Sequence, residues 1–169
     1  MKSTRVAFAL TLLLAAGSGH AVEVSMAQGG VHFSVPDGWL GIMETEGDPE
    51  ARVFQVPDAS ATGRTALARV TVTVKQVASM AEFSQYQAEA SAKALGLPGY
   101  QAETVQPAPN TSRYSARENG VTFSYVEHYW FKPGYAIQLR CMRPAQSEAG
   151  AAWAGAFDKG CAGIAEQLK

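Results

Sequence analysis

The strongest fold signal lies in residues 112–142, which read SRYSARENGVTFSYVEHYWFKPGYAIQLRCM. Apolar and polar residues alternate on both sides of Asn119-Gly120, a dipeptide typical of two-residue hairpins because both residues tolerate positive φ. Pro133-Gly134 marks a second turn. The pattern therefore predicts three consecutive antiparallel strands, at residues 112–117, 121–131 and 135–142.

Strand patterns also occur in the first half of the chain. In residues 67–77, Val70, Val72 and Val74 alternate with polar residues, so the valines share one face of a strand. We expect further strands at residues 31–35, 52–56 and 101–106. A tight turn is expected at residues 36–39, and a loop of small and polar residues at 58–63.

Two helices are predicted, one inside the chain and one at its end. Ser79 and Glu82 have the spacing of a capping box, and Gly96 is expected to end that helix in a left-handed conformation. The last helix follows Pro144 and Ser147. Each helix carries an apolar stripe at helical spacing, formed by Phe83, Tyr86, Ala90 and Ala94 in the first and by Trp153, Phe157, Cys161, Ile164 and Leu168 in the second.

The order of elements is strands, helix, strands, helix, with adjacent late strands antiparallel. Such segregation predicts an α+β fold, an antiparallel β-sheet that carries two main helices. The 169 residues suffice for one domain, and 47% hydrophobic content is typical of a globular chain. With 14 Lys and Arg against 15 Asp and Glu, a nucleic-acid-binding function is not expected.

The N-terminus has the three-part pattern of a secretory signal. Lys2 and Arg5 precede an apolar run over residues 6–16, and small residues lead to Ala21. We expect cleavage after Ala21, which would leave residues 22–169 as a single α+β domain in a bacterial periplasm. The apolar run is too short for a stable membrane anchor, which takes about 20 residues.

The two cysteines are predicted to form a structural disulfide. Cys141 follows Ile137 and Leu139 at a spacing of two on a strand, and Cys161 belongs to the apolar stripe of the last helix. Both therefore point into the expected interface between helix and strand, and export favours oxidation. Two buried free thiols and a redox pair are the alternatives, although no Cys-x-x-Cys spacing supports the latter.

The phrase Phe33-Ser34-Val35-Pro36-Asp37-Gly38-Trp39 and the order of elements after it resemble the PsbP-like α/β/α sandwich superfamily. The order comprises the strands within residues 52–77, a capped helix, a hairpin meander and a C-terminal helix. Bacterial members include exported proteins of the DcrB type and adaptors of type VI secretion. The resemblance implies a mostly non-enzymatic protein that binds or escorts other proteins, and it supplies no catalytic residue to carry over.

Polar residues on three predicted strands point to a candidate binding face. Alternation puts polar or aromatic residues at 69–75, 122–130 and 138–140 away from the core. Trp and Arg are common at binding hot spots, so the candidates for contacting a partner are Arg69, Lys75, His128, Trp130 and Arg140. The alternative is the ordinary solvated side of an antiparallel sheet. Trp39 and Trp153 lie in apolar patterns and are expected in the core.

Glu127 interrupts an aromatic series formed by Phe123, Tyr125, Tyr129 and Phe131. A carboxyl group in such a setting can act as an acid or base. The alternative is that it lies near a sheet end and reaches solvent or a basic partner.

The sequence contains no phosphate-binding loop, dinucleotide fingerprint or hydrolase elbow. We therefore predict no enzyme, no cofactor and no metal site. The function expected is an exported protein-binding module, for example an immunity protein that neutralises a secreted toxin. Alternatives are a cell-envelope accessory protein assisting a membrane or secretion complex, and a small hydrolase that uses Glu127.

Overall fold

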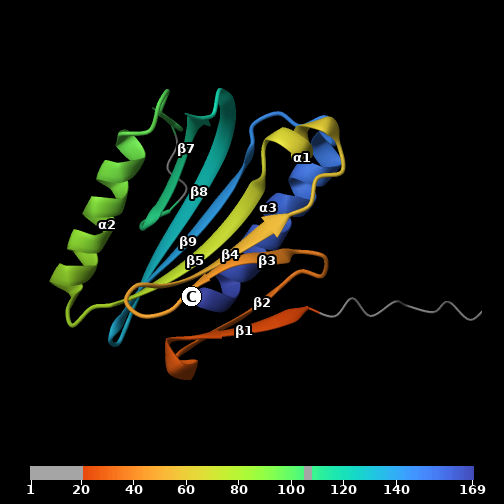
Figure 1. Ribbon diagram of the computed structural model, residues 1–169. Coiled ribbons are helices and arrows are strands. Elements are labelled where there is room, and N and C mark those ends of the chain that lie inside the picture. Colours follow the sequence, from red (N-terminus) through yellow and green to blue (C-terminus); the bar gives the residue numbers. More distant parts are fainter. Residues whose placement is uncertain (1–20, 105–107) are drawn as a thin grey trace, which may run out of the picture.

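The structure is a computed structural model that describes residues 21–104 and 108–169. An antiparallel sheet of seven strands carries long helices on opposite faces, which confirms the predicted α+β class (Figure 1). The expected signal segment lies outside the described residues, apart from Ala21. The strands are β1 (Val22–Met26), β2 (Val31–Val35), β3 (Leu40–Thr45), β4 (Glu50–Val56), β5 (Ala68–Gln76), β6 (Gln101–Ala102), β7 (Thr111–Glu118), β8 (Val121–Lys132) and β9 (Tyr135–Pro144). The helices are η1 (Ala27–Gly29), α1 (Ala61–Thr65), α2 (Met80–Leu95) and α3 (Gly150–Leu168).

The large sheet has the strand order β3-β4-β5-β9-β8-β7-β6, while β1 and β2 form a separate hairpin. The three late strands pair as predicted, and Asn119 and Gly120 both have positive φ in the turn between β7 and β8. Strand β9, at the centre of the sheet, then pairs with β5, so the valine-rich strand lies inside the sheet with a neighbour on each side.

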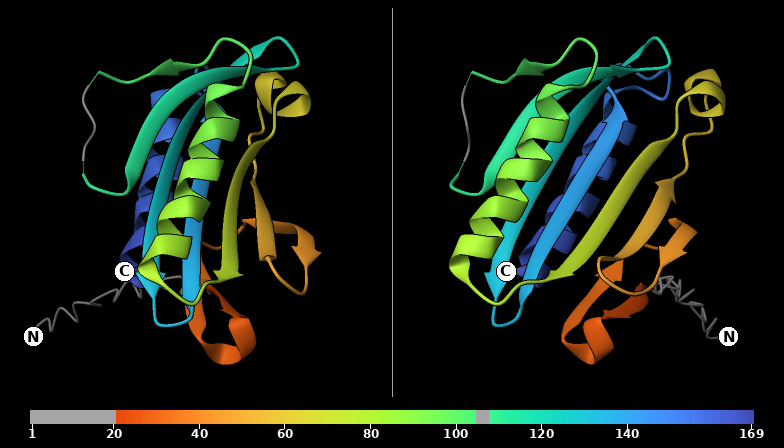
Figure 2. Two further views of the ribbon diagram at one scale, coloured as in Figure 1. Left: turned by 90° about the vertical axis from the view of Figure 1, so that its left-hand side faces the viewer. Right: turned by 60° about the vertical axis from the view of Figure 1, so that its left-hand side comes forward.

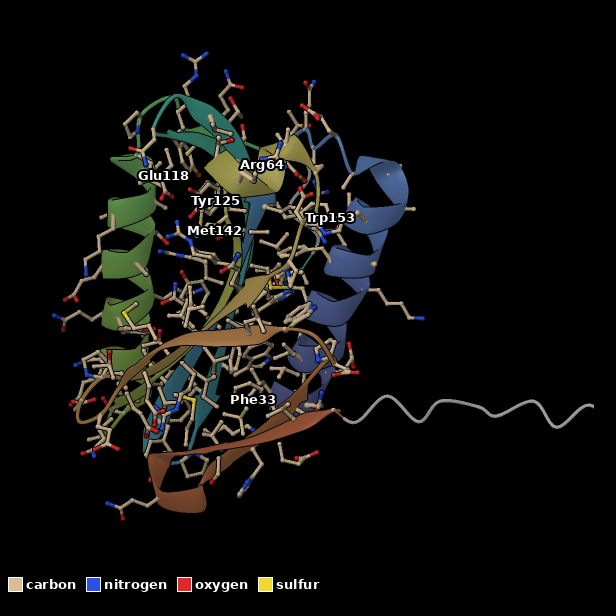
Figure 3. The ribbon with its side chains drawn as sticks, turned by 45° about the vertical axis from the view of Figure 1, so that its right-hand side comes forward. Phe33, Arg64, Glu118, Tyr125, Met142 and Trp153 are labelled. Atoms are coloured by element: carbon tan, nitrogen blue, oxygen red, sulfur yellow. A yellow bond between two sulfur atoms is a disulfide. The ribbon has the colours of Figure 1, made fainter. Side chains whose placement is uncertain are left out.

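Helix α3 and the β1–β2 hairpin cover one face of the sheet, and the main apolar core lies between them and the strands. The valine face of β5 and the apolar stripe of α3 meet there, as their spacing predicts. The predicted disulfide is present: Cys141 of β9 is bonded to Cys161 of α3, with their Cα atoms 6.3 Å apart. Trp39 and Trp153 are partly buried against this core, and Figure 3 labels Trp153 on α3.

Helix α2 lies on the opposite face and packs against β8 and β9 (Figure 2). Its capping interaction forms, because Ser79 Oγ accepts a hydrogen bond from the Glu82 backbone N–H at 3.2 Å. Phe83, Ala90 and Ala94 are buried, in agreement with the predicted inward face. The prediction for Gly96 is wrong: it has right-handed helical φ and ψ, and the first left-handed glycine after the helix is Gly99.

Several elements depart from the sequence-based expectations. Strands β1 and β3 were not predicted, and β3 lies at a sheet edge with all six residues exposed, so it has no alternation of buried positions to detect. The loop expected at residues 58–63 contains the start of α1. The strand expected at 101–106 is reduced to the two residues of β6, and residues 105 and 106 lie outside the described part.

Candidate functional site

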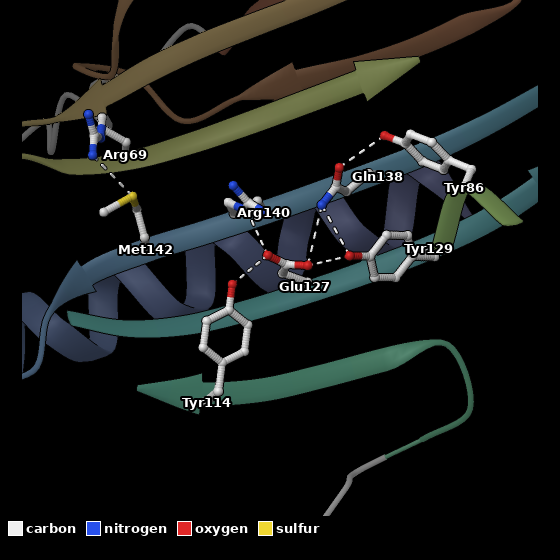
Figure 4. A network of polar contacts seen from close by, with 8 residues as sticks. All are labelled: Arg69, Tyr86, Tyr114, Glu127, Tyr129, Gln138, Arg140 and Met142. Atoms are coloured by element: carbon white, nitrogen blue, oxygen red, sulfur yellow. Dashed lines mark hydrogen bonds and ion pairs between the residues drawn. The ribbon is translucent and has the colours of Figure 1, made fainter. Parts of the chain in front are cut away.

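Glu127 is the centre of a buried polar network between the sheet and α2. Its side chain is 1% exposed and accepts hydrogen bonds from the hydroxyls of Tyr114, at 2.7 Å, and Tyr129 (Figure 4). Arg140 Nε donates to Glu127 Oε1 at 2.6 Å, and Gln138 Nε2 donates to Oε2 at 3.3 Å. Four donors thus satisfy both carboxylate oxygens, which is what burial of a charged carboxylate requires.

Strand register explains why these residues meet. Glu127 of β8 is directly opposite Arg140 of β9, and Tyr129 is directly opposite Gln138. Directly opposed residues point to the same face of an antiparallel pair. Helix α2 adds one hydrogen bond to the network, because the Tyr86 hydroxyl donates to Gln138 Oε1 at 3.0 Å. The network thereby holds α2 to β9 and joins the two smaller apolar clusters on this face, one containing Tyr114 and the other Tyr129.

The electrostatics keep every donor of this network protonated near neutral pH. Burial, reinforced by the negative charge of Glu127, raises the pKa of the Tyr114 and Tyr129 hydroxyls well above the usual tyrosine value. Burial is also the main reason that the pKa of Tyr86 rises to about 12. Desolvation alone would lower the pKa of Arg140, but the Glu127 carboxylate together with Tyr114 and Tyr129 outweighs this effect and raises that pKa.

The expectation that Glu127 lies near a sheet end and reaches solvent is wrong, although its basic partner is confirmed. The residue lies in the middle of β8 and is fully enclosed by protein. In this conformation a substrate atom has no route to a carboxylate that is 1% exposed and already accepts four hydrogen bonds. The network is suited to positioning Arg140 and α2 rather than to transferring a proton to a bound molecule.

The five candidate binding residues do not form one face. Arg69, Lys75 and Arg140 point to the α2 side, where Thr71 lies directly opposite Arg140. His128 and Trp130 point to the α3 side, because His128 is directly opposite Leu139 of the main core. The expected grouping paired the wrong faces of β8 and β9, a one-residue error in register that exchanges the two faces.

His128 and Trp130 are partly buried on the α3 side. Their rings stack with centroids 5.6 Å apart, and His128 Nδ1 lies 3.1 Å from Thr111 Oγ1. Desolvation by burial, with the positive charges of Arg113 and Lys169, lowers the pKa of His128. Both residues therefore belong to the packing beside α3 and are separated by the sheet from the other three candidates.

The three remaining candidates differ in how much of their donor capacity is already used. Arg69 Nη2 contacts both carboxylate oxygens of Glu118, at 2.7 and 2.8 Å, and Lys75 lies 3.7 Å from an oxygen of Asp48. Arg140 bonds Glu127 through Nε, and its two terminal nitrogens have no protein hydrogen-bond partner among the described residues. Its side chain is 35% exposed, so the fixed guanidinium presents these nitrogens at the margin of the network.

Sequence reasoning missed Tyr86, Tyr114 and Tyr129 as partners of the polar network. A signal was present, because a buried glutamate on an aromatic face needs donors and two of the four aromatic residues beside it on β8, Tyr125 and Tyr129, are tyrosines. What was missing was the register that brings Gln138 and Arg140 beside Glu127 rather than beside His128.

No group of three or more His, Cys, Asp or Glu side chains within residues 21–104 and 108–169 is arranged to hold a metal ion. In the same part of the chain, no helix has the length and apolar character needed to cross a membrane. Compared with known proteins, the chain matches no protein-family model, no curated protein and no solved structure.

Proposed function

We propose that this chain is an exported, non-enzymatic protein-binding module of a bacterial periplasm. Its disulfide is typical of proteins in oxidising compartments. The observation that carries the binding role is the incomplete cover on the α2 side of the sheet. Helix α2 packs on β8 and β9, whereas no helix of the described residues covers β3, β4 and β5 on that side (Figure 2).

The surface proposed for binding is a row of directly opposed residues that runs outward from Arg140. Thr71 of β5, Val53 of β4 and Met43 of β3 follow it across the sheet. Arg140 and Thr71 are half-buried, Val53 is buried, and Met43 is 57% exposed. The row offers a preorganised cation, hydroxyl donors and apolar area on rigid strands, a combination found at protein interfaces. We call this row with its neighbour Thr73 the open strip.

A concrete form of this function is an immunity protein that blocks a secreted toxin. Such a protein needs a stable, rigid surface and no catalytic groups, and both the disulfide and the buried network supply rigidity.

The second candidate is a cell-envelope accessory protein. It is favoured by the helix on each face of the sheet, which is the layer order that the PsbP-like resemblance implies. The enclosure of Glu127 argues against the hydrolase alternative.

The test is affinity capture of a partner from envelope and secreted fractions, with variants of the open strip. Thr71→Glu with Thr73→Glu adds bulk and negative charge to the strip, and Ala88→Glu with Ala92→Glu adds the same charge to exposed positions of α2. We expect one stoichiometric partner that the first pair loses by at least about tenfold in affinity and the second retains. The proposal is contradicted if no partner is recovered or if both pairs behave alike.

The purified partner then separates the two forms of the function. A partner that kills cells when produced alone, and is neutralised by this chain at equal stoichiometry, supports the immunity role. A partner that belongs to an envelope or secretion complex and has no toxicity supports the accessory role.

A further inference from the structure

Exposed apolar side chains concentrate on two strands at one side of the molecule. Seven large hydrophobic residues of the described chain are exposed, and four of them lie on β1 and β3. These four are Val22, Leu40, Ile42 and Met43, with exposed fractions between 46% and 57%. Isolated exposed apolar residues are ordinary, but a group on neighbouring strands marks an interaction site.

Both strands also have an edge without a pairing partner. Among the described residues, β3 pairs only with β4 and β1 pairs only with β2. A groove of about 550 Å³ separates them, lined by Val24 and Ser25 from β1, Ile42 and Met43 from β3, and Phe54 from β4. Unpaired backbone N–H and C=O groups along an exposed edge are a template for an added strand.

The surroundings of this groove are acidic. Glu23, Glu44 and one cation, Arg52, line it, and a neighbouring cavity of about 560 Å³ at the β3–β4 turn is lined by Glu46, Asp48 and Glu50. Among the described residues, only Arg52 and Lys75 form ion pairs with these five carboxylates. The excess negative charge favours a basic occupant. It disfavours a second copy of this chain, because two β3 edges would bring two acidic rims together.

We propose that an extended segment of a partner protein, basic and with apolar residues at alternate positions, adds as a strand to the outer edge of β3 in this groove. Its backbone pairs with β3, alternate apolar side chains contact Ile42 and Phe54, and its basic residues face the acidic rim. The proposal rests on the protein-binding function and deepens it, since it names where and in which conformation the partner binds. The added strand would continue the sheet beside Met43, at the end of the open strip.

The test uses a synthetic peptide of defined sequence, acetyl-Lys-Val-Thr-Val-Thr-Val-Lys-amide, with the purified isotope-labelled chain. We expect it to shift and protect the backbone amides of β3 in nuclear magnetic resonance spectra. In one control peptide, alternate backbone amides are N-methylated and cannot donate hydrogen bonds to β3. In the other, Glu replaces Lys and is repelled by the acidic residues around the groove. Each control should bind at least about tenfold more weakly than the first peptide.

Two methionines of equal exposure provide matched variants of the protein. Met43 of β3 is 57% exposed and Met80 of α2 is 56% exposed. Met43→Lys should weaken peptide binding at least about tenfold, because a lysine on an edge strand repels a basic peptide and hinders the pairing of a further strand. Met80→Lys adds the same charge away from the groove and should leave the affinity unchanged.

Four results would overturn the proposal: no binding at millimolar peptide, equal binding of the N-methylated peptide, shifts that avoid β3, or self-association of the chain that Met43→Lys abolishes. Failure of this site and failure of the proposed function are separable. If the Met43→Lys variant still binds a captured partner and the Thr71→Glu, Thr73→Glu variant does not, the proposed function is supported and the strand site is contradicted. If the peptide adds to β3 but no partner is captured, the strand site is supported and the proposed function is contradicted.

Discussion

The two faces of the sheet are stabilised in different ways. On the α3 side a continuous apolar core and the Cys141–Cys161 bond hold the helix to the strands. On the α2 side two smaller apolar clusters are joined by the polar network around Glu127. The α3 face is stabilised by apolar burial and a cross-link. On the α2 face, part of the buried area consists of polar side chains, and these must be placed accurately to satisfy one another's hydrogen bonds. Accurate placement is what the proposed binding surface beside Arg140 requires.

The largest expected effect comes from leaving Glu127 without its cation. Arg140→Met keeps the length of the side chain but removes the charge, so a buried carboxylate loses its ion pair. We expect a loss of about 3 kcal/mol in the free energy of unfolding, at the low end for buried pairs because Arg140 is partly exposed. Urea unfolding followed by circular dichroism measures it.

The matched control for this change is Arg69→Met on the same face. Arg69 and Glu118 form a pair of partly exposed side chains, so its loss should cost under about 1 kcal/mol. Equal losses for the two variants would show that the α2 face does not depend on its buried network.

The second effect concerns the disulfide on the opposite face. Cys141→Ala with Cys161→Ala removes a cross-link between residues 20 positions apart, and we expect a loss of about 3 kcal/mol in the chain-entropy model. The measurement compares the urea concentration at the unfolding midpoint of the double variant with that of the wild-type protein in its oxidised form. An unchanged midpoint would mean that the apolar core alone holds α3 to the sheet.

A smaller effect tests the close packing of α3. A Cβ atom at Gly160 would lie 2.5 Å from the ring of Trp39 and 3.1 Å from Pro36, so Gly160→Ala should destabilise by about 1–3 kcal/mol through overpacking. Nothing lies within 4 Å of a Cβ at Gly163 on the same helix. Gly163→Ala should therefore stabilise the chain, by about 0.5–1 kcal/mol. Thermal unfolding of both variants checks the difference in sign.

The smallest effect is the pH dependence contributed by His128. Its folded-state pKa lies below the ordinary value of 6.5, so the unfolded chain binds a proton more readily. This contribution is fully present above pH 6.5 and is lost as the pH falls from there through the lowered pKa. His128→Asn should flatten the fall in stability below pH 6.5 in urea titrations, and His32→Asn at an exposed position of β2 is the control. An identical slope in wild type and His128→Asn would contradict the expectation.

Prediction from sequence succeeded where burial and turn chemistry act locally. The valines of β5, the Ser79 cap and the Asn119-Gly120 turn each carry their own signal, and the structure confirms all three. It failed for β3, whose exposed residues show no buried periodicity. It also failed for the candidate binding face, because faces were assigned strand by strand and the relative register of β8 and β9 is not visible in either strand alone.

The sequence by itself determined the α+β class, the position of the long helices and the pairing of the two cysteines. These follow from periodicity, which is a property of neighbouring residues. Only the tertiary structure decided that Glu127 faces Arg140 and that His128 and Trp130 pack beside α3. It also decided that β1 and β3 each have one edge that no other strand of residues 21–104 and 108–169 pairs with. The physical reason is that strand alternation repeats every two residues, so each strand has two equivalent assignments of its faces. Pairing across the whole sheet selects one of them.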